Sequence, residues 1–327
     1  PTAVYQEKRD PMTGSDAAFS IRRAGFLLWL LLFAAGLLLC GREVSAAVVE
    51  SLTLCTQVLL PALFPFFVLS GWLAASGSAA ALAPLLQRPM GKLFHLSGAC
   101  APALLLGLVG GYPVGTNATV QLYRAGQCSR EDALYLLRFC NNAGPAFLIS
   151  ALGCGMLGDP RAGALLYGAQ VLSALLIGVL FRRKSSAVKP DCITAESQPA
   201  FSLSALLETV RSAFAAFQNV CAFVLFFSVM KRLLFQLPLL RQGGLPSALL
   251  SGLLEVTGGL SSLAALPLPR QLLLPCCACL AGFGGLSVTL QSASLLLEAG
   301  LPCRDHVVFK LLQGALAAGI AFLLARL

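Results

Sequence analysis

The residues best placed to bind a solute follow a glycine-rich interruption in an apolar segment. Residues 99–109 are almost entirely apolar, residues 110–115 read GGYPVG, and polar residues begin directly after them at Thr116. Pro113 has no N–H to donate and its ring disfavours a helical conformation at Tyr112, while the glycines permit a tight reversal. Non-helical backbone in a bilayer is tolerated only where protein buries it or where it lines a water-filled cavity. This stretch therefore predicts a polar site at membrane depth.

Three further interruptions carry polar side chains. Asn141 and Asn142 begin the sequence NNAGP inside a segment that would otherwise span the bilayer, Glu255 stands among apolar residues before Thr-Gly-Gly, and Ser287 follows a second Gly-Gly pair. An ionisable side chain inside a membrane is costly, so it indicates a functional site by default.

The candidate solute contacts are Gly111, Tyr112, Thr116, Asn117, Asn141, Asn142, Asn219, Glu255, Ser287, Thr289 and Gln291. The polar residues among them also have structural interpretations. The asparagines of NNAGP can satisfy backbone groups freed by Pro145, and Glu255 can pair with an arginine at the membrane interface. The hydroxyl and amide side chains can cap helices or form hydrogen bonds between helices. The residue types alone leave both interpretations open.

Composition identifies the chain as a polytopic membrane protein. Apolar residues make up 57% of its 327 residues and charged residues 11%, and the mean hydropathy is +0.81. A soluble core and surface cannot accommodate these values. The net charge of +9 comes from Lys and Arg scattered at the ends of apolar segments. It therefore indicates membrane topology rather than nucleic-acid binding.

Metal, cofactor and catalytic chemistry are not expected. Most of the 12 cysteines lie in or beside apolar runs, which favours small buried hydrophobic residues over disulfides, and the chain has only two histidines. A Ser/His/Asp constellation and a phosphate-binding loop are absent from the sequence. We therefore expect no enzyme, no cofactor and no metal site.

The apolar segments divide the chain into a tail, an isolated helix and two larger units. The expected divisions are a disordered cytoplasmic tail at 1–20, a first transmembrane helix at 21–43, a first unit at 44–181, a basic cytoplasmic linker at 182–200 and a second unit at 201–327. Within the first unit, we expect residues 44–75 to form an interfacial turn leading into a proline-kinked span. Residues 79–96 are expected to form a short surface helix.

Counting membrane crossings decides how residues 97–125 lie. The basic linker at 182–200 should be cytoplasmic, like the N-terminal tail. If residues 97–125 crossed the bilayer, the linker would emerge on the outside. If they form a re-entrant hairpin that enters and leaves on the cytoplasmic side, the linker lies inside. We therefore predict a re-entrant hairpin.

The second half contains a matching segment. An offset of 174 places Arg124-Ala125-Gly126 against Glu298-Ala299-Gly300 and aligns both Gly-Gly pairs, although a chance match of two Leu/Ala/Gly-rich segments is the alternative. Three crossings separate the copies, so the second is inverted. Inverted units with interrupted hairpins are typical of secondary transporters, whose half-helix ends meet around the substrate. Half-helix starts near Thr116 and Ser287 would favour an anionic group.

These motifs resemble the nucleoside-recognition gate domain family and, more closely, the YlbJ-type sporulation integral membrane proteins. The resemblance rests on LLPALFPFFVLSGWL at 59–73, GGYPVGTNATVQLYRAG at 110–126, SREDALYLLRFCNNAGPAF at 129–147, LLEVTGGLSSL at 253–263 and GFGGLSVTLQ at 282–291. It implies an all-helical fold related to concentrative nucleoside carriers. For the YlbJ branch it also implies movement of dipicolinic acid across a membrane around the developing spore. The second Gly-Gly segment lacks the Tyr-Pro pair of the first.

Three hypotheses follow. The first is a multi-pass transporter of a small organic anion, with dipicolinic acid named by the resemblance alone, in the bacterial cytoplasmic membrane or a membrane of the developing spore. The second is a carrier of nucleosides or another small solute. The third is a non-transporting scaffold of spore formation, against which the interruptions within lipid argue. The expected partners are the solute and the bilayer, and a homo-oligomer stays open.

Overall fold

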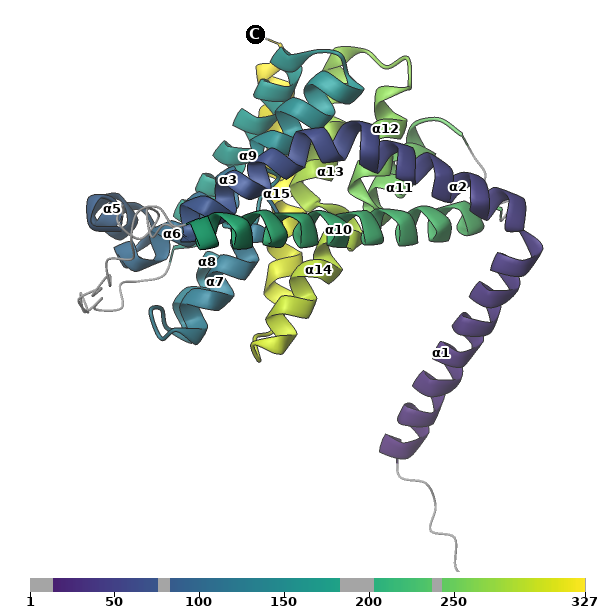
Figure 1. Ribbon diagram of the computed structural model, residues 1–327, viewed down its shortest axis with the longest axis horizontal. Coiled ribbons are helices and arrows are strands. Elements are labelled where there is room, and N and C mark those ends of the chain that lie inside the picture. Colours follow the sequence, from purple (N-terminus) through teal and green to yellow (C-terminus); the bar gives the residue numbers. More distant parts are fainter. Residues whose placement is uncertain (1–13, 76–82, 183–202, 237–242, 327) are drawn as a thin grey trace, which may run out of the picture.

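The computed structural model describes residues 14–75, 83–182, 203–236 and 243–326, and every regular element in these ranges is a helix (Figure 1). The first half contains α1 (Gly14–Leu39), α2 (Gly41–Leu54), η1 (Cys55–Leu59), α3 (Leu60–Ala75), α5 (Ala83–Pro89), η2 (Met90–Phe94), η3 (Gly98–Cys100), α6 (Ala101–Val109), α7 (Val114–Arg124), α8 (Arg130–Leu136), η4 (Ala146–Met156) and α9 (Pro160–Leu180). The second half contains α10 (Leu203–Leu234), α11 (Leu245–Leu254), α12 (Val256–Ala264), α13 (Arg270–Phe283), α14 (Gly285–Glu298) and α15 (Arg304–Leu324). Of these, η1, η2 and η4 are π-helical.

Five helical stretches within the described ranges are long and apolar enough to cross a bilayer. They are Gly41–Leu69, Pro160–Leu180, Leu206–Leu234, Arg270–Glu298 and Arg304–Leu324. The shortest have 21 residues, which at about 1.5 Å per residue match a hydrocarbon core of about 30 Å. Residues 23–39 form a shorter apolar helix whose large side chains are exposed, such as Leu38 at 86%. The predicted class, an all-α polytopic membrane protein, is confirmed.

Helices α6 and α7 form the predicted re-entrant hairpin. The chain reverses at residues 110–113, where Gly111 has a φ of +79°, a value that favours glycine. A methyl group added to Gly107 would lie 3.0 Å from the Cα of Gly115, on the other arm. Because neither residue has a side chain, the two arms touch at their backbones, and α7 returns toward the side from which α6 came.

Helices α11 and α12 form a second hairpin, which was not predicted from the sequence. The reversal occurs at Glu255, whose backbone is extended (φ −144°, ψ 117°) between the two helices. A methyl group added to Gly259 would lie 2.1 Å from the Cα of Gly252. Each hairpin therefore closes on a pair of glycines near its tip.

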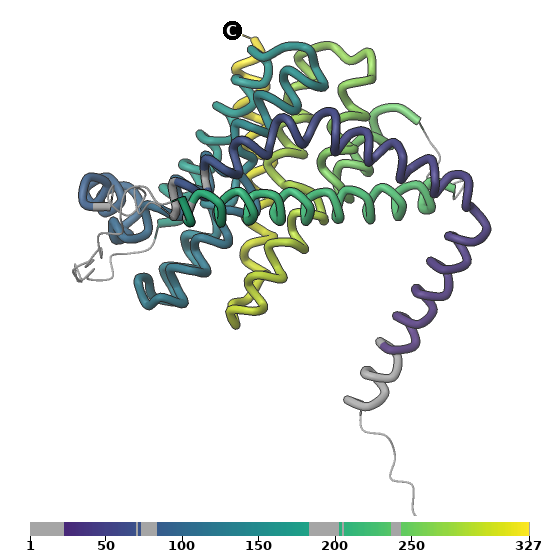
Figure 2. The backbone as a smooth tube through the Cα atoms, in the orientation of Figure 1, coloured from purple at the N-terminus to yellow at the C-terminus, as the bar shows by residue number. Residues whose placement is uncertain are grey.

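Two further segments pass through the protein with a break at mid-length. α8 and η4 are separated by residues 137–145, which include the predicted NNAGP break, and α13 meets α14 at Gly284, where φ is +85°. Arg124 donates a hydrogen bond to the carbonyl oxygen of Glu298 at 3.0 Å, so the loops that follow α7 and α14 lie together. Figure 2 shows both loops at the bottom of the view. We call this side the Arg124 end.

The opposite side is marked by an ion pair between Asp159, before α9, and Arg270, at the start of α13, with 2.8 Å between Oδ2 and Nη1. We call it the Asp159 end. The α8–η4 segment therefore runs from the Arg124 end to the Asp159 end, and α13–α14 runs in the opposite direction.

Two more helix pairs are antiparallel. The ring of Phe181, after α9, lies 4.9 Å from that of Phe309, near the start of α15. Glu50 on α2 forms an ion pair with Arg232, near the end of α10. The long helix of residues 41–75, the hairpin, the broken segment and the last span of the first unit thus each have a counterpart of opposite direction in the second, which is the predicted inverted arrangement. Among the described residues, α5, η2 and η3 have no such counterpart.

The alignment that led to this prediction is nevertheless wrong. The offset of 174 pairs α7 with α14, but these helices run in the same direction and both end at the Arg124 end. By direction and order, the first hairpin corresponds to the second, α8–η4 to α13–α14, and α9 to α15. An offset of 143 aligns Gln170 with Gln313 and Arg161 with Arg304 in the last pair. The two Gly-Gly pairs have the same residue types because both interrupt helices. The chain reverses at Gly110-Gly111, whereas it continues in the same direction after Gly284-Gly285.

Two local predictions are also wrong. Residues 44–75 continue as helix through η1 and show no interfacial turn. The wider π-helical turn precedes Pro61, whose ring would clash with the carbonyl four residues earlier in a regular helix. Residues 14–20 begin α1 rather than being disordered. The predictions for residues 1–13 and for the linker after Arg182 fall outside the described residues.

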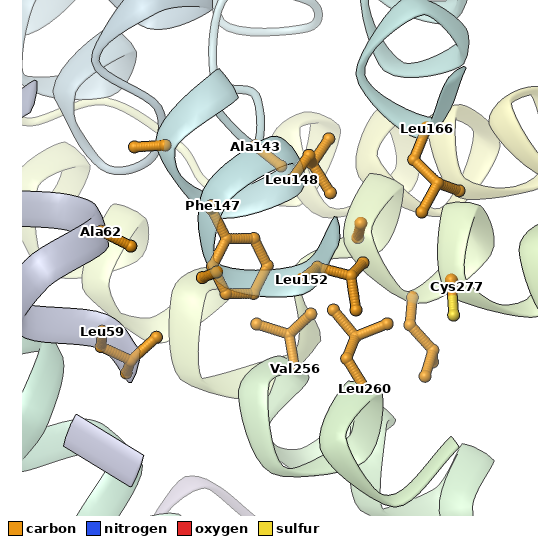
Figure 3. Close-up of a cluster of buried hydrophobic side chains, with 14 of the residues drawn as sticks. Leu59, Ala62, Ala143, Phe147, Leu148, Leu152, Leu166, Val256, Leu260 and Cys277 are labelled. Atoms are coloured by element: carbon orange, nitrogen blue, oxygen red, sulfur yellow. The ribbon is translucent and has the colours of Figure 1, made fainter. Parts of the chain in front are cut away.

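Apolar side chains from both units meet in the core (Figure 3). Leu59, Phe147 and Leu152 of the first unit pack with Val256 and Leu260 of the second, all within one buried cluster. This packing holds η4 against the tip of the second hairpin, and it therefore fixes the NNAGP break relative to the reversal at Glu255.

Candidate functional site

The tips of both hairpins and both helix breaks meet at one cavity. Its lining residues are Leu63, Phe67, Gly110, Gly111, Tyr112, Gly144, Ala146, Phe147, Val220, Phe223, Val224, Glu255, Val256, Thr257, Ser287, Val288 and Gln291. The centres of water-sized molecules can occupy about 40 Å³ within it. A single water needs about 10–15 Å³, so the cavity holds only a few waters in this conformation. A larger solute requires the hairpin tips to move apart.

The lining combines aromatic rings with a few polar groups. The rings of Tyr112 and Phe147 lie 6.1 Å apart at a tilted angle, and Phe67 and Phe223 add two more rings. Cavities that bind small organic molecules have this composition, in which apolar walls supply contact area and a few polar groups fix orientation.

Two polar atoms of the lining lack a hydrogen-bond partner among the described residues. They are the hydroxyl of Tyr112 and Oε1 of Gln291, and both atoms are buried. A buried polar atom without a partner costs about 1–3 kcal/mol. Tyr112 and Gln291 are therefore the groups that a solute or water in the cavity would satisfy.

Glu255 is the charged residue of the lining. Its side chain is buried, and its carboxylate accepts hydrogen bonds from the backbone N–H of Thr257 at 2.7 Å and of Gly258 at 2.5 Å, which caps α12. A methyl group added to Gly258 would lie 3.1 Å from Glu255 Oε2 and 3.3 Å from Lys231 Nζ. The carboxylate and the ammonium are therefore no more than 6.4 Å apart, the sum of those distances. The ammonium and the helix N-terminus offset the buried negative charge.

The start of α14 presents the opposite polarity. Its N-cap residue, Gly284, offers no side-chain acceptor to the first N–H groups, and Ser287 in its first turn lines the cavity. The uncapped positive end of a helix favours an anion or another hydrogen-bond acceptor. The cavity thus contains an acceptor at Glu255 and a donor region at α14.

A second, polar cavity lies beyond Gly258. The centres of water-sized molecules can occupy about 330 Å³ within it. Its lining residues are Ala47, Glu50, Ser51, Thr53, Leu54, Gln57, Val58, Ser228, Lys231, Arg232, Gly258, Ser261 and Ser262. Because Gly258 also donates to Glu255, the turn at residues 255–258 separates the two cavities. This polar space leads from the Arg232–Glu50 ion pair toward the hairpin tip.

The asparagines of NNAGP belong to a different buried cluster. Asn141 Nδ2 donates to Ser292 Oγ at 2.9 Å. Asn142 Oδ1 accepts from Nε2 of both Gln170, at 3.4 Å, and Gln313, at 2.5 Å. These residues and Lys310, described below, form what we call the amide cluster, and none of them lines the first cavity.

Comparisons with known proteins cover most of the chain. A family model described as Gate, nucleoside recognition, matches residues 56–160, which include the first hairpin and the NNAGP break. The sporulation integral membrane protein YlbJ of Bacillus subtilis (strain 168) is 30% identical over 315 residues, which cover 84% of this chain and 75% of that protein. The chain belongs to the YlbJ family. No solved structure matches this YlbJ-family chain.

The cavity of this YlbJ-family chain brings together part of the predicted set. Gly111, Tyr112, Glu255, Ser287 and Gln291 line it. The other predicted residues do not line this cavity, and they are Thr116, Asn117, Asn141, Asn142, Asn219 and Thr289.

The helix face on which each of these residues lies explains why it does not line the cavity. Asn117 and Asn219 are exposed, and Thr289 donates back to the carbonyl oxygen of Gly285. Thr116 is buried but does not line the cavity, and its hydroxyl has no described partner. A helix displays only one face to a cavity, and sequence proximity to a break does not show which residues occupy that face.

The groups that surround the polar residues of this YlbJ-family chain were not predicted from the sequence. Lys231 reads there as a topology signal like the other basic residues, although its ammonium lies within 6.4 Å of Glu255. Lys310 and Gln313 lie within the predicted last span. The signal was available, because a lysine and a glutamine three residues apart inside an apolar run are costly in lipid unless they have partners.

Proposed function

We propose that this chain is a multi-pass transporter that carries a small organic solute through the cavity between the two hairpin tips. The observation that supports this most directly is the convergence of four backbone breaks from two antiparallel units on one cavity. Such convergence near the membrane midplane is the arrangement by which secondary transporters bind substrate and alternate access. Motion of one hairpin would open the cavity to the Arg124 end, and motion of the other would open it to the Asp159 end.

The leading solute is a small organic anion, with dipicolinate as the named candidate because of the resemblance to the YlbJ branch. The uncapped start of α14 supports an anionic group. The rings of Tyr112 and Phe147 support a planar body. The charge of Glu255 does not prevent this, because two N–H groups and Lys231 already offset it.

A nucleoside is the second candidate. The family model that matches residues 56–160 is described by nucleoside recognition. Glu255 is a strong acceptor for hydroxyl or N–H donors, which a nucleoside carries and dipicolinate at neutral pH lacks. The two solutes therefore make opposite demands on Glu255.

We further propose that the Arg124 end and the N-terminus face the cytoplasm. Helix α9 ends at the Arg124 end and leads into the basic linker of residues 182–200. Cytoplasmic loops of membrane proteins are enriched in Lys and Arg. Cysteine labelling of the linker in intact cells and in inverted vesicles tests this orientation.

Flux into liposomes that contain the purified full chain tests the function. We expect accumulation of labelled dipicolinate, inhibited by excess unlabelled dipicolinate and not by uridine. Gln291→Leu should lower flux about two- to twelvefold at low solute concentration, because it removes the amide N–H groups that can donate to a carboxylate, and one hydrogen bond contributes about 0.5–1.5 kcal/mol. Asn219→Ala, an exposed change beside the cavity-lining part of α10, is the matched control and should leave flux unchanged.

Each alternative has its own result. Uridine flux without dipicolinate flux would favour the nucleoside carrier. Absence of flux for both solutes, in protein that unfolds cooperatively, would favour a scaffold. Equal loss of flux in Gln291→Leu and Asn219→Ala would contradict the assignment of the cavity.

A further inference from the structure

The break in α8–η4 leaves backbone carbonyl groups without helical partners. Helix α8 ends at Leu136, and the chain has no regular structure from residue 140 to 144 before η4 begins. The carbonyl groups at the end of a helix carry partial negative charge, and within a membrane they require donors or a cation. In transporters with broken helices, such unwound carbonyl groups commonly coordinate the coupling cation.

Here a side chain from another helix occupies that position. Lys310 of α15 is 1% exposed, and its ammonium donates to the carbonyl oxygen of Asn141 at 2.7 Å and to Oε1 of Gln313 at 2.8 Å. One turn earlier on α15, His306 Nδ1 lies 2.9 Å from the carbonyl oxygen of Leu137. Since a carbonyl can only accept, this contact requires the N–H on Nδ1. Helix α15 thus supplies hydrogen-bond donors to two backbone carbonyl groups of the break.

The ammonium has no acidic partner. Pairs such as Arg138–Asp305, Arg232–Glu50 and Arg270–Asp159 lie within 4.0 Å, whereas Lys310 forms no such pair with a described acidic residue. A buried charge without a counter-ion is expensive in a membrane. The oxygens that face Lys310 are therefore the groups that compensate it, and they are the kind of oxygens that also bind Na⁺ or K⁺.

The rest of the amide cluster holds these oxygens in place. Gln313 accepts from Lys310 through Oε1 and donates through Nε2 to Asn142. Asn142 Nδ2 in turn donates to the carbonyl oxygen of Phe139, on the same break. The acceptor set is thus preorganised around the ammonium, which saves the cost of ordering it.

We propose that Lys310 is a tethered cation that occupies a coupling-cation position, so that the broken helix is held without bound Na⁺ or K⁺. A consequence, which depends on the proposed function, is that solute movement does not draw on a Na⁺ or K⁺ gradient. The structural part of the inference stands apart from transport and is tested by unfolding.

The experiment measures thermal unfolding of the full-length protein in detergent at equal ionic strength of sodium, potassium or choline chloride. We expect the wild-type midpoint to be the same in all three salts, because the position is already filled. A higher midpoint in sodium or potassium chloride than in choline chloride would overturn the proposal. This arm needs no variant.

The second arm uses Lys310→Ala, which empties the position. We expect a lower midpoint in choline chloride and a recovery that rises with the logarithm of added methylammonium concentration, as linkage requires for a ligand that binds the folded state. Lys310→Met, which fills the space without charge, should be lowered and not recovered. Lys92→Ala, an exposed lysine on η2, is the control. A Lys310→Ala midpoint equal to that of the wild type, or one lowered without recovery, would overturn the proposal.

Flux separates the two levels of inference. If the wild type transports no solute while the unfolding results are as expected, the proposed function fails and the tethered cation stands. If solute accumulates only with an inward Na⁺ gradient, the tethered cation fails and the transport function stands.

Discussion

The second hairpin depends on the absence of a side chain at Gly259. An alanine there would place its methyl group 2.1 Å from the Cα and 2.3 Å from the backbone nitrogen of Gly252, whereas ordinary contact begins at 3.4 Å. The arms of the hairpin would therefore have to separate by at least about 1.3 Å, the difference between 3.4 and 2.1 Å. The obstacle is backbone, which has no rotamer by which to move away.

The magnitude follows from two opposing effects. Overpacking costs about 1–3 kcal/mol, and the rigid neighbour places Gly259→Ala at the upper end. Alanine is about 1 kcal/mol more favourable than glycine in a helix interior. We therefore expect the free energy of unfolding to fall by about 2 kcal/mol.

The assay is unfolding of the purified protein in detergent, followed by tryptophan fluorescence. The matched control is Gly319→Ala on α15, where an added methyl group meets nothing within 4 Å. The control should gain about 1 kcal/mol, so the two alanine variants should differ by about 3 kcal/mol. Equal stability of the two variants would refute the glycine contact as the reason for the hairpin's close approach.

Three further predictions concern single residues. Gly107→Ala should prevent folding of the first hairpin, because its methyl group would lie 1.7 Å from the carbonyl oxygen of Cys140; normal yield and unfolding midpoint would contradict this. Glu255→Gln should destabilise the protein by about 1–2 kcal/mol, since a neutral amide caps α12 less well than a carboxylate, while Glu208→Gln on the exposed face of α10 should be neutral in the same unfolding assay. Asp159, in the loop before α9, has a pKa held below its ordinary value by the N–H of Ala162 and by Arg270, so its contribution to stability should be full at neutral pH and lost as pH falls through that lowered pKa. The stability difference between wild type and Asp159→Asn should therefore shrink in acid, and a difference independent of pH would contradict the assignment.

The breaks that sequence reasoning located are those with strong local chemistry. Pro113 and its flanking glycines force a reversal at GGYPVG, and Pro145 ends the NNAGP break, so both were predicted without knowledge of the fold. The break at Glu255 contains no proline. The hairpin depends instead on the contact between Gly252 and Gly259. This contact is tertiary, and its only trace in the sequence is that two glycines stand seven residues apart.

The repeat alignment failed for a related reason. Gly110-Gly111 and Gly284-Gly285 both interrupt a helix, but whether the chain then turns back depends on what packs against it. The first pair is followed by a backbone contact within its own hairpin, between Gly107 and Gly115. The second lies where Gly282 packs on α15, so α14 continues toward the Arg124 end. Identical residue types could not show whether the chain reverses at a Gly-Gly pair or continues in the same direction after a break in the helix.

About half of the candidate residues line the cavity, and the division follows helix faces. Glu255 and Gln291 were found because polar groups in apolar runs require partners. Asn142 was found for the same reason, yet its partners are Gln170 and Gln313. Polarity in lipid predicts that a group is engaged, and only the three-dimensional arrangement shows whether it engages a solute or the protein itself.

The shared acceptor on Asn142 makes the two halves of the molecule chemically unequal. Gln170 and Gln313 occupy matching places at an offset of 143, and both reach one oxygen. The place that matches Asn142 at this offset is Gly285, which has no side chain. A chimera assembled from two second halves would therefore contain two amide donors and nothing to receive them. The helices of the two halves are related by an approximate twofold axis, but the acceptor that both glutamines use comes from the first half, so the second half cannot substitute for the first.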